Sequence, residues 1–482
     1  MIMPLLMEFG MYTLILRVVT LLLVISIQDF TLLEKVNRYL IKKLILLTFL
    51  TVISCSNPDK DINSSIPISN GTLELAKTFG GSKNDVGKSV IATADGGFAV
   101  LGFTQSMDGD VAGKTSENYD YWVLKFDSQA LLEWNKTYGG SGDDRGSQLI
   151  ETSDGGYMLI GYSDSSDEDV TLNNGNRDFW VVKTDNSGAI LWEKSFGYGG
   201  ADEGVSILET SDNHFILSGI LDVTASGGEG NIGRNTATHA GGDYWSIKIN
   251  PSGDIVWSRF YGGSFTDAPT GVIENTSSDL ITVGRSDSND VDISNNKGTY
   301  DFWVVKSSSN GDIIWEKSYG GLEIDEARDV ISIDNENQII VGDTRSEEQD
   351  VSSNNGAADL WILKISNQGD IIWEKSLGGS NFDVARSINP TFDNGFIIAG
   401  SSRSSNGDVN ENKGQNDAWV IKVDNTGQLL WETTVGGSEI DFAYDAVQLI
   451  NGTIVAVGET SSFNGDVSVN KGFTDLLIIK IN

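Results

Sequence analysis

The feature that most constrains this 482-residue chain is a unit of about 58 residues that recurs seven times. In each unit a hydrophobic, mostly aromatic residue is followed by glycine, and an aspartate stands six residues after the hydrophobic residue. The hydrophobic positions are Phe79, Tyr138, Phe196, Tyr261, Tyr319, Leu377 and Val435, with spacings of 59, 58, 65, 58, 58 and 58 residues. One short unit cannot bury its own hydrophobic surface, so neighbouring units must stack to form a shared core.

Each unit contains four short segments with the composition of β-strands. In the first full unit we predict strands over residues 89–93, 98–104, 121–126 and 132–138. They are rich in Val, Ile, Phe, Trp and Thr, and Gly, Asp, Asn and Ser fill the turns between them. No stretch has the sustained periodicity of an amphipathic helix, so we expect essentially no helix after Cys55.

Four antiparallel strands repeated seven times predict an all-β fold, a seven-bladed β-propeller over residues 73–482. The two ends of this region indicate how the ring closes. A lone strand at 73–79 matches the fourth strand of a unit, and the chain stops after a third strand at 476–481. We expect this N-terminal strand to complete the last blade, because their pairing removes the free edges of an open array.

All twelve tryptophans fall at two positions of the repeat. Six open the third strand and six lie in the fourth strand: Trp122, Trp180, Trp245, Trp303, Trp361 and Trp419, then Trp134, Trp192, Trp257, Trp315, Trp373 and Trp431. Leu477 and Leu75 take these positions in the closing blade. A large aromatic ring at the same position of every repeat predicts that these side chains form the hydrophobic core between blades. The alternative is that the rings form a platform on which sugars stack.

Residues 1–54 have the character of a targeting segment, with translation starting near residue 36. Basic residues at 38–43 precede a ten-residue apolar run at 44–53, which is too short to span a bilayer as a helix. The run ends in Val52-Ile53-Ser54-Cys55, which resembles the lipobox of bacterial lipoproteins.

The lipobox resemblance implies that lipid is attached to Cys55 and that residues 55–72 are a tether to a membrane. An ordinary signal peptide with an incidental cysteine is the alternative. We therefore expect a lipid-anchored protein of the bacterial cell envelope, in the outer membrane.

Composition excludes several function classes. Asp and Glu number 68 against 33 Lys and Arg, a formal charge of −35, so the chain lacks the basic footprint that nucleic acids require. One cysteine excludes a disulfide within the chain, and two histidines leave little material for His-based sites. The sequence has no Ser-His-Asp order, no P-loop and no His-Glu-x-x-His motif. We expect a monomeric binding or scaffold module rather than an enzyme.

Aspartate recurs at three positions of every unit, mostly in loops that share one face of a propeller. The set that follows the repeat marker is Asp85, Asp144, Asp202, Asp267, Asp325, Asp383 and Asp441. The other two sets supply candidate calcium ligands, before a valine and at the start of the third strand: Asp110, Asp169, Asp290, Asp350, Asp408 and Asp466, then Asp120, Asp178, Asp301, Asp359, Asp417 and Asp475.

Two interpretations of these aspartates remain open. Calcium prefers six to eight oxygen ligands and would offset the negative charge of the chain. The alternative is that the side chains cap N–H groups of the loops, and identical placement in every unit favours this capping role.

A lysine recurs in the third strand of all seven units: Lys125, Lys183, Lys248, Lys306, Lys364, Lys422 and Lys480. We expect it to form an ion pair between blades with one of the aspartate sets.

The third unit also carries an insertion at 226–242, which contains Arg234 and His239. These two residues are our candidates for contacting a protein or glycan partner, and a tolerated loop insertion is the alternative.

The unit resembles the long β-propeller repeats of bacterial secreted proteins and lipoproteins, with phrases such as Asp154-Gly-Gly-Tyr-Met-Leu-Ile-Gly-Tyr162 and Trp180-Val-Val-Lys183. Asp185-Asn-Ser-Gly188-Ala-Ile-Leu-Trp192 and Asp424-Asn-Thr-Gly427-Gln-Leu-Leu-Trp431 are similar to the tryptophan-docking motif of quinoprotein propellers, which has one more residue after the aspartate. The resemblance implies the fold and a structural role for the motif.

Quinoprotein dehydrogenases usually have eight blades and a vicinal cysteine pair, which this chain lacks. A quinoprotein-like oxidoreductase and a carbohydrate-active or lectin-like propeller are the alternative functions.

Overall fold

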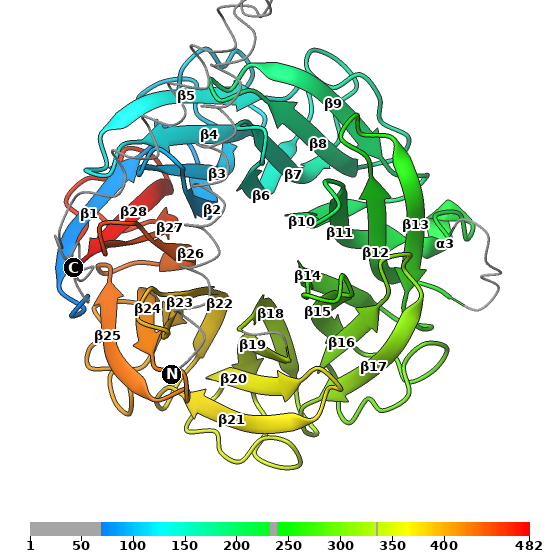
Figure 1. The fold of residues 1–482 in the computed structure, drawn as a ribbon. Coiled ribbons are helices and arrows are strands. Elements are labelled where there is room, and N and C mark those ends of the chain that lie inside the picture. Colours follow the sequence, from blue (N-terminus) through cyan, green and yellow to red (C-terminus); the bar gives the residue numbers. More distant parts are fainter. Residues whose placement is uncertain (1–68, 232–238, 334–335) are drawn as a thin grey trace, which may run out of the picture. The chain divides into compact units, whose positions relative to one another are not determined.

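The structure is a computed structural model and describes residues 69–231, 239–333 and 336–482. In that part the chain forms seven sheets of four antiparallel strands, arranged as blades around a central axis (Figure 1). The first strand of each blade lies nearest the axis and the fourth lies at the rim. The predicted all-β, seven-bladed propeller is confirmed.

The blades are numbered here from the first complete unit. Blade 1 contains β2 (Asp85–Ala92), β3 (Phe98–Thr104), β4 (Asp120–Phe126) and β5 (Leu132–Tyr138). Blade 2 contains β6 (Asp144–Glu151), β7 (Tyr157–Ser163), β8 (Asp178–Thr184) and β9 (Ile190–Phe196). Blade 3 contains β10 (Glu203–Glu209), β11 (Phe215–Asp222), β12 (Gly242–Ile249) and β13 (Ile255–Tyr261). Blade 4 contains β14 (Asp267–Glu274), β15 (Leu280–Ser286), β16 (Asp301–Ser307) and β17 (Ile313–Tyr319).

The remaining blades follow the same order. Blade 5 contains β18 (Asp325–Ser332), β19 (Asn337–Thr344), β20 (Asp359–Ser366) and β21 (Ile371–Leu377). Blade 6 contains β22 (Asp383–Pro390), β23 (Phe396–Ser402), β24 (Asp417–Val423) and β25 (Leu429–Val435). Blade 7 contains β26 (Asp441–Gln448), β27 (Ile454–Thr460), β28 (Asp475–Ile481) and the N-terminal β1 (Leu73–Phe79).

The two ends of the propeller meet in blade 7. Strand β1 pairs antiparallel with β28, so the blue and red strands of Figure 1 lie side by side. Just before β1, the backbone N–H groups of Asn70 and Thr72 both donate to the carbonyl of Asn482, each at 3.0 Å. The N-terminal strand therefore completes the last blade and closes the ring, as the sequence predicted.

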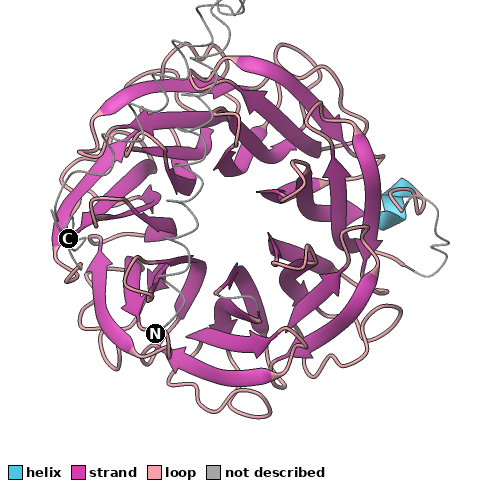
Figure 2. Ribbon diagram, in the orientation of Figure 1, coloured by secondary structure: helices cyan, strands magenta, loops and turns pink. Residues whose placement is uncertain are grey.

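Helix is almost absent from the described residues, as Figure 2 shows. The one helical turn, α3 (Val223–Ser226), begins at the cap Asp222, whose side chain accepts from the N–H of Ala225 at 2.9 Å. No helix in the described part is long and apolar enough to cross a bilayer. The targeting segment and Cys55 lie outside the described residues, so the lipid anchor stays a prediction.

The innermost strands differ from the sequence prediction in one way. Strand β2 begins at Asp85 and not at residue 89, because a β-bulge between Gly87 and Ser89 breaks the alternation of side chains there. Every innermost strand has a bulge at the same register. The bulged residue has no partner on the second strand, and in the seven blades it is Lys88, Ser147, Val205, Thr270, Arg328, Arg386 and Tyr444.

The tryptophans of the third strand form the core between blades. All six are at most 1% exposed, and four of them meet an aromatic ring of the preceding blade. The rings of Tyr121 and Trp180, for example, are 4.7 Å apart between centroids, and the Tyr121 hydroxyl donates to the Trp180 carbonyl at 2.9 Å. For these six positions the core interpretation is confirmed.

The tryptophans of the fourth strand dock on the next blade. Trp134 of blade 1 lies against Gly188 in the last turn of blade 2, and the Tyr138 hydroxyl donates to the Gly188 carbonyl at 2.7 Å. The same contact joins Trp192 to Gly253, Trp257 to Gly311, Trp315 to Gly369, Trp373 to Gly427 and Trp431 to Gly71. This docking agrees with the structural role that the motif resemblance implies.

Candidate binding site

The first set of aspartates stabilises the turn between blades. In blade 5, Asp325 accepts from the N–H of Gly321 at 2.7 Å and from the Ser346 hydroxyl at 2.8 Å. All seven members of the set accept a backbone N–H from four residues earlier: Asp85, Asp144, Asp202, Asp267, Asp325, Asp383 and Asp441. Each is fully buried, so these carboxylates are part of the fold.

The second set lies in the loop between the second and third strands and reaches the same turn. Asp110 accepts from the N–H of Gly80 at 3.0 Å, and five further blades repeat this bond. In blade 4 the acceptor is Asp292, not the predicted Asp290. Asp290 instead accepts from the N–H of Ser264 at 2.9 Å. The pattern of aspartate before valine selects the wrong residue here because blade 4 has Ile293 where the other blades have valine. Asp292 stands 30 residues after Gly262, as Asp110 stands 30 residues after Gly80.

The third set opens the third strand, and in six blades it keeps one oxygen without a partner. Asp301, for example, accepts from the N–H of Lys297 at 2.6 Å through Oδ2, whereas its buried Oδ1 has no partner among the described residues. Burial raises the pKa of Asp301 to about 7, and the carboxylates of Asp325 and Asp350 add to that rise. The same oxygen is buried and unpartnered in Asp178, Asp243, Asp359, Asp417 and Asp475.

Blade 1 is the exception in the third set. Asp120 Oδ1 lies 2.7 Å from Nζ of Lys114, whose side chain is buried in the loop before β4. Burial still raises the pKa of Asp120 to about 6, although the hydrogen bond and charge of Lys114 oppose that rise.

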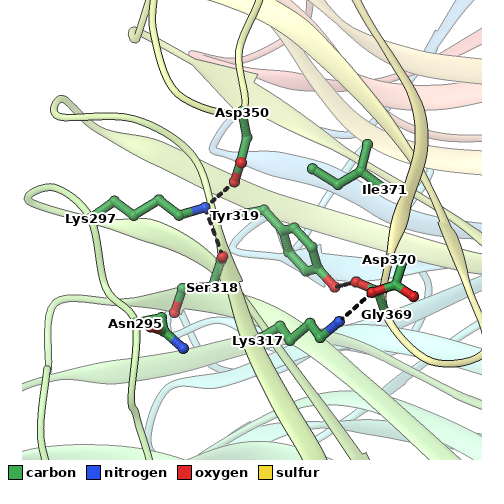
Figure 3. A pocket seen from close by; sticks show the side chains of 9 residues that line it. All are labelled: Asn295, Lys297, Lys317, Ser318, Tyr319, Asp350, Gly369, Asp370 and Ile371. Carbon is green, nitrogen blue, oxygen red and sulfur yellow. Dashed lines mark hydrogen bonds and ion pairs between the residues drawn. The ribbon is translucent and has the colours of Figure 1, made fainter.

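The three sets meet across blade boundaries, where a basic side chain often joins them. Figure 3 shows one such place, a cavity of about 330 Å³ between blades 4 and 5. Lys297 of blade 4 forms an ion pair with Asp350 of blade 5 and donates to the carbonyl of Ser318 at 3.1 Å. Lys413 pairs with Asp466 at 3.0 Å, and Lys471 pairs with Asp110, each across another boundary.

His239, a predicted partner-binding residue, takes this joining role in blade 3. Its Nδ1 lies 2.6 Å from Asp243 Oδ2, its Nε2 lies 3.9 Å from Asp292 of blade 4, and its side chain is 8% exposed. Burial opposes the charged ring, but the hydrogen bond with Asp243 and the nearby carboxylates outweigh it and raise the pKa of His239. A buried ring offers little to a partner. Arg234 lies outside the described residues.

The candidate calcium ligands do not converge on a common point. Within the described residues no group of three or more His, Cys, Asp and Glu side chains is placed to hold a metal ion. At the boundaries of Lys297, Lys413 and Lys471 an ammonium group already neutralises the second-set carboxylate. The described side chains therefore do not form a calcium cage, and calcium binding stays a prediction.

In six blades the recurring lysine of the third strand forms an ion pair within its own blade and not between blades. Lys125 lies 2.8 Å from Asp95 and Lys183 lies 2.7 Å from Asp154, both carboxylates of the turn between the first two strands. In blade 7, Lys480 instead lies 3.3 Å from Glu74 of β1. The expectation of a pair with the recurring aspartate sets was wrong, because the lysine points toward the opposite face.

The central channel is lined by bulged residues that differ from blade to blade. It holds a cavity of about 530 Å³ that the innermost strands line. The bulged residues there are Ser147, Val205 and Thr270 in blades 2 to 4, but Arg328, Arg386, Tyr444 and Lys88 in blades 5, 6, 7 and 1. One sector of the channel is therefore basic and aromatic, whereas the opposite sector is small and neutral.

The recurring sequence patterns did not predict this basic sector. Each of its residues stands three positions after the first-set aspartate, so a comparison of the repeats at that one position would have revealed it. A site that is formed by differences between repeats has no periodicity, and the patterns that predicted the fold are all periodic.

No protein-family model matches the chain. A regulatory protein of Caulobacter vibrioides, FlaEY, is 24% identical over 328 residues, which is 65% of this chain but only 31% of that protein. The chain thus spans about a third of the length of this relative.

Solved propellers are similar in fold at low sequence identity. They include the WD40 domain of Pan2 from Neurospora crassa, with a TM-score of 0.45 and 9% identity over 86% of this chain and 97% of that one. They also include an aldose sugar dehydrogenase from Streptomyces coelicolor in its PQQ-bound form, with a TM-score of 0.37 and 12% identity over 86% of this chain and 100% of that one. At these scores the likenesses carry no argument about function.

Proposed function

We propose that this protein is a non-catalytic binding module of the bacterial cell envelope, held on a membrane by lipid on Cys55. The ligand enters the central channel on the side of blades 5, 6, 7 and 1. The observation that carries the proposal is the break in seven-fold symmetry at the bulged residues, since features that serve the fold repeat in every blade.

The side chains that recur in every blade have structural roles, which leaves the non-recurring side chains of the channel as the candidates for binding a ligand. The first two aspartate sets and the fourth-strand tryptophans serve the turns and the contacts between blades. The basic sector has no such repeated role. The name of the Caulobacter relative, a regulatory protein, supports binding rather than catalysis.

The anchor is tested by metabolic labelling of the full chain with a fatty-acid analogue in a bacterial host. We expect label on the wild-type protein and its recovery with outer membranes, because two or more acyl chains hold a protein on a bilayer. Cys55→Ser should lose the label and the membrane association, whereas the neighbouring control Ser56→Ala should keep both.

Two outcomes would contradict the proposal. A cleaved but unlabelled wild-type protein would support the ordinary signal peptide. Turnover of a sugar by the purified, detergent-solubilised protein with added pyrroloquinoline quinone would support the oxidoreductase instead.

A further inference from the structure

We propose that Lys88 and Arg386, with the Tyr444 ring between their blades, bind the carboxylate or phosphate group of a small anionic ligand inside the channel. The site rests on the proposed function of the channel as a binding module and adds the chemistry of the ligand.

Lys88 carries a charge that has no ion-pair partner among the described residues. Its Nζ lies 3.6 Å from the centre of the Tyr444 ring, and no described carboxylate is in ion-pair contact with it. The acid whose charge acts on it, Glu459, is engaged by the Tyr444 hydroxyl, which donates to it at 2.6 Å. Burial, together with the charge of Arg386, lowers the pKa of Lys88 to about 8.

Arg386 contacts the same aromatic ring. Its guanidinium carbon is 5.1 Å from the centre of the Tyr444 ring and 5.4 Å from that of Phe442. Its Nε is buried without a hydrogen-bond partner among the described residues. A guanidinium N–H that is buried and unpaired is costly unless a ligand completes it.

The carboxylates near the channel interact with groups other than Lys88 and Arg386. Arg328, the third cation, pairs with Asp343 at 3.1 Å and with Glu326. Asp329 accepts the N–H of Ile388 at 2.9 Å. Asp445 accepts the N–H of Val90 at 2.9 Å, so both these carboxylates join innermost strands of neighbouring blades. None of these described acids makes an ion-pair contact with Lys88 or Arg386.

Two neighbouring cations without an ion-pair contact among the described residues are unexpected in this protein. The chain has 68 acidic residues and 33 basic ones, so carboxylates to neutralise two cations are abundant. Two neighbouring cations that raise each other's energy are stabilised when an anion from outside binds between them. The planar guanidinium presents two parallel N–H groups that fit the two oxygens of a carboxylate or phosphate.

The surrounding cavity sets the size of the ligand. About 530 Å³ is much larger than an inorganic ion and is within the range of small-molecule sites. The opposite sector, with Ser147, Val205 and Thr270, leaves neutral wall for the body of an organic anion.

The test measures binding of inorganic phosphate and of succinate to the full, detergent-solubilised protein by calorimetry at neutral pH. We expect at least one of the two anions to bind to the wild-type protein. Lys88→Gln and Arg386→Gln should each weaken that binding about tenfold or more, since charge-assisted hydrogen bonds to the anion are lost. Succinate binding alone would identify a carboxylate ligand, and phosphate alone a phosphorylated one. The matched control is Arg145→Gln, an innermost-strand arginine that is already paired with Asp143 at 3.2 Å and should leave binding unchanged.

A second measurement does not depend on guessing the ligand. In buffer without oxyanions, Lys88→Gln should maintain or raise the melting temperature, because it removes a buried charge that has no ion-pair contact and lies near Arg386. A fall in melting temperature with Lys88→Gln, or wild-type protein that binds neither anion, would overturn the proposal. Loss of lipid on Cys55 would leave these binding results unchanged, so failure of the anchor and failure of the anion site are distinguishable.

Discussion

At the scale of single residues, the contact between blades depends on pairs of tryptophan and glycine. The ring of Trp134 comes so close to Gly188 that an added Cβ would lie 3.0 Å from the ring, and Gly188 also has φ +75°. The closing boundary shows that the two positions are complementary. Leu75 of β1 replaces the tryptophan there, and the turn residue it faces is Ala130 rather than glycine.

This complementarity predicts that Gly188→Ala lowers stability by about 1–3 kcal/mol, since the methyl group meets the ring and the backbone conformation disfavours it. The control is Gly155→Ala in the same blade. Gly155 has φ +88° but nothing within 4 Å of an added Cβ, so its substitution should cost only about 1 kcal/mol. Equal losses in thermal or denaturant unfolding would show that the ring contact contributes nothing.

At the scale of elements, β1 is a strand that the fold needs although it is remote in sequence from its blade. It pairs with β28 from Phe79↔Leu476 to Leu73↔Ile481. The residues just before it supply Gly71 and the Ser69 carbonyl to the Trp431 ring, which donates Nε1 at 3.0 Å. Without this segment the last blade has a free edge next to an undocked tryptophan.

Deleting residues 69–79 should therefore lower the melting temperature strongly and cause self-association, because the exposed edge of β28 can pair with another chain. Deleting residues 56–66, which precede β1 in the sequence, is the control of equal length and should have little effect on unfolding. Thermal unfolding and light scattering provide the measurements. A chain without 69–79 that stays monomeric and equally stable would show that the ring closes without β1.

At the scale of the whole molecule, the blade boundaries concentrate buried carboxyl groups. Burial raises the pKa of Asp120, Asp178, Asp243, Asp359, Asp417 and Asp475 to about 6, and that of Asp301 to about 7. A group whose pKa is higher in the folded state stabilises the fold below its unfolded pKa, near 4. That stabilisation is lost as pH rises through the folded pKa.

We expect the melting temperature to fall as the pH rises from 4 to 7, because in that range the unfolded chain loses the protons that the seven folded carboxyl groups still hold. Asp301→Asn keeps the shape and removes one ionisation, so it should stabilise the protein by on the order of 1–3 kcal/mol at pH 8 and little at pH 4. Glu117→Gln, an exposed substitution with the same change of charge, is the control. The explanation fails if both variants respond to pH as the wild type does.

The repeat period, turn residues and orphan strand were sufficient to predict the seven blades, the limits of β3 and β5, and the pairing of β1 with β28. Strand patterns and turns are local, so the sequence by itself determined them. Tertiary structure alone decided that His239 bridges two blades and that Lys88 meets Tyr444. Lys88 and Tyr444 come from opposite ends of the propeller sequence, so only ring closure and the bulges of the innermost strands place their side chains together in one channel.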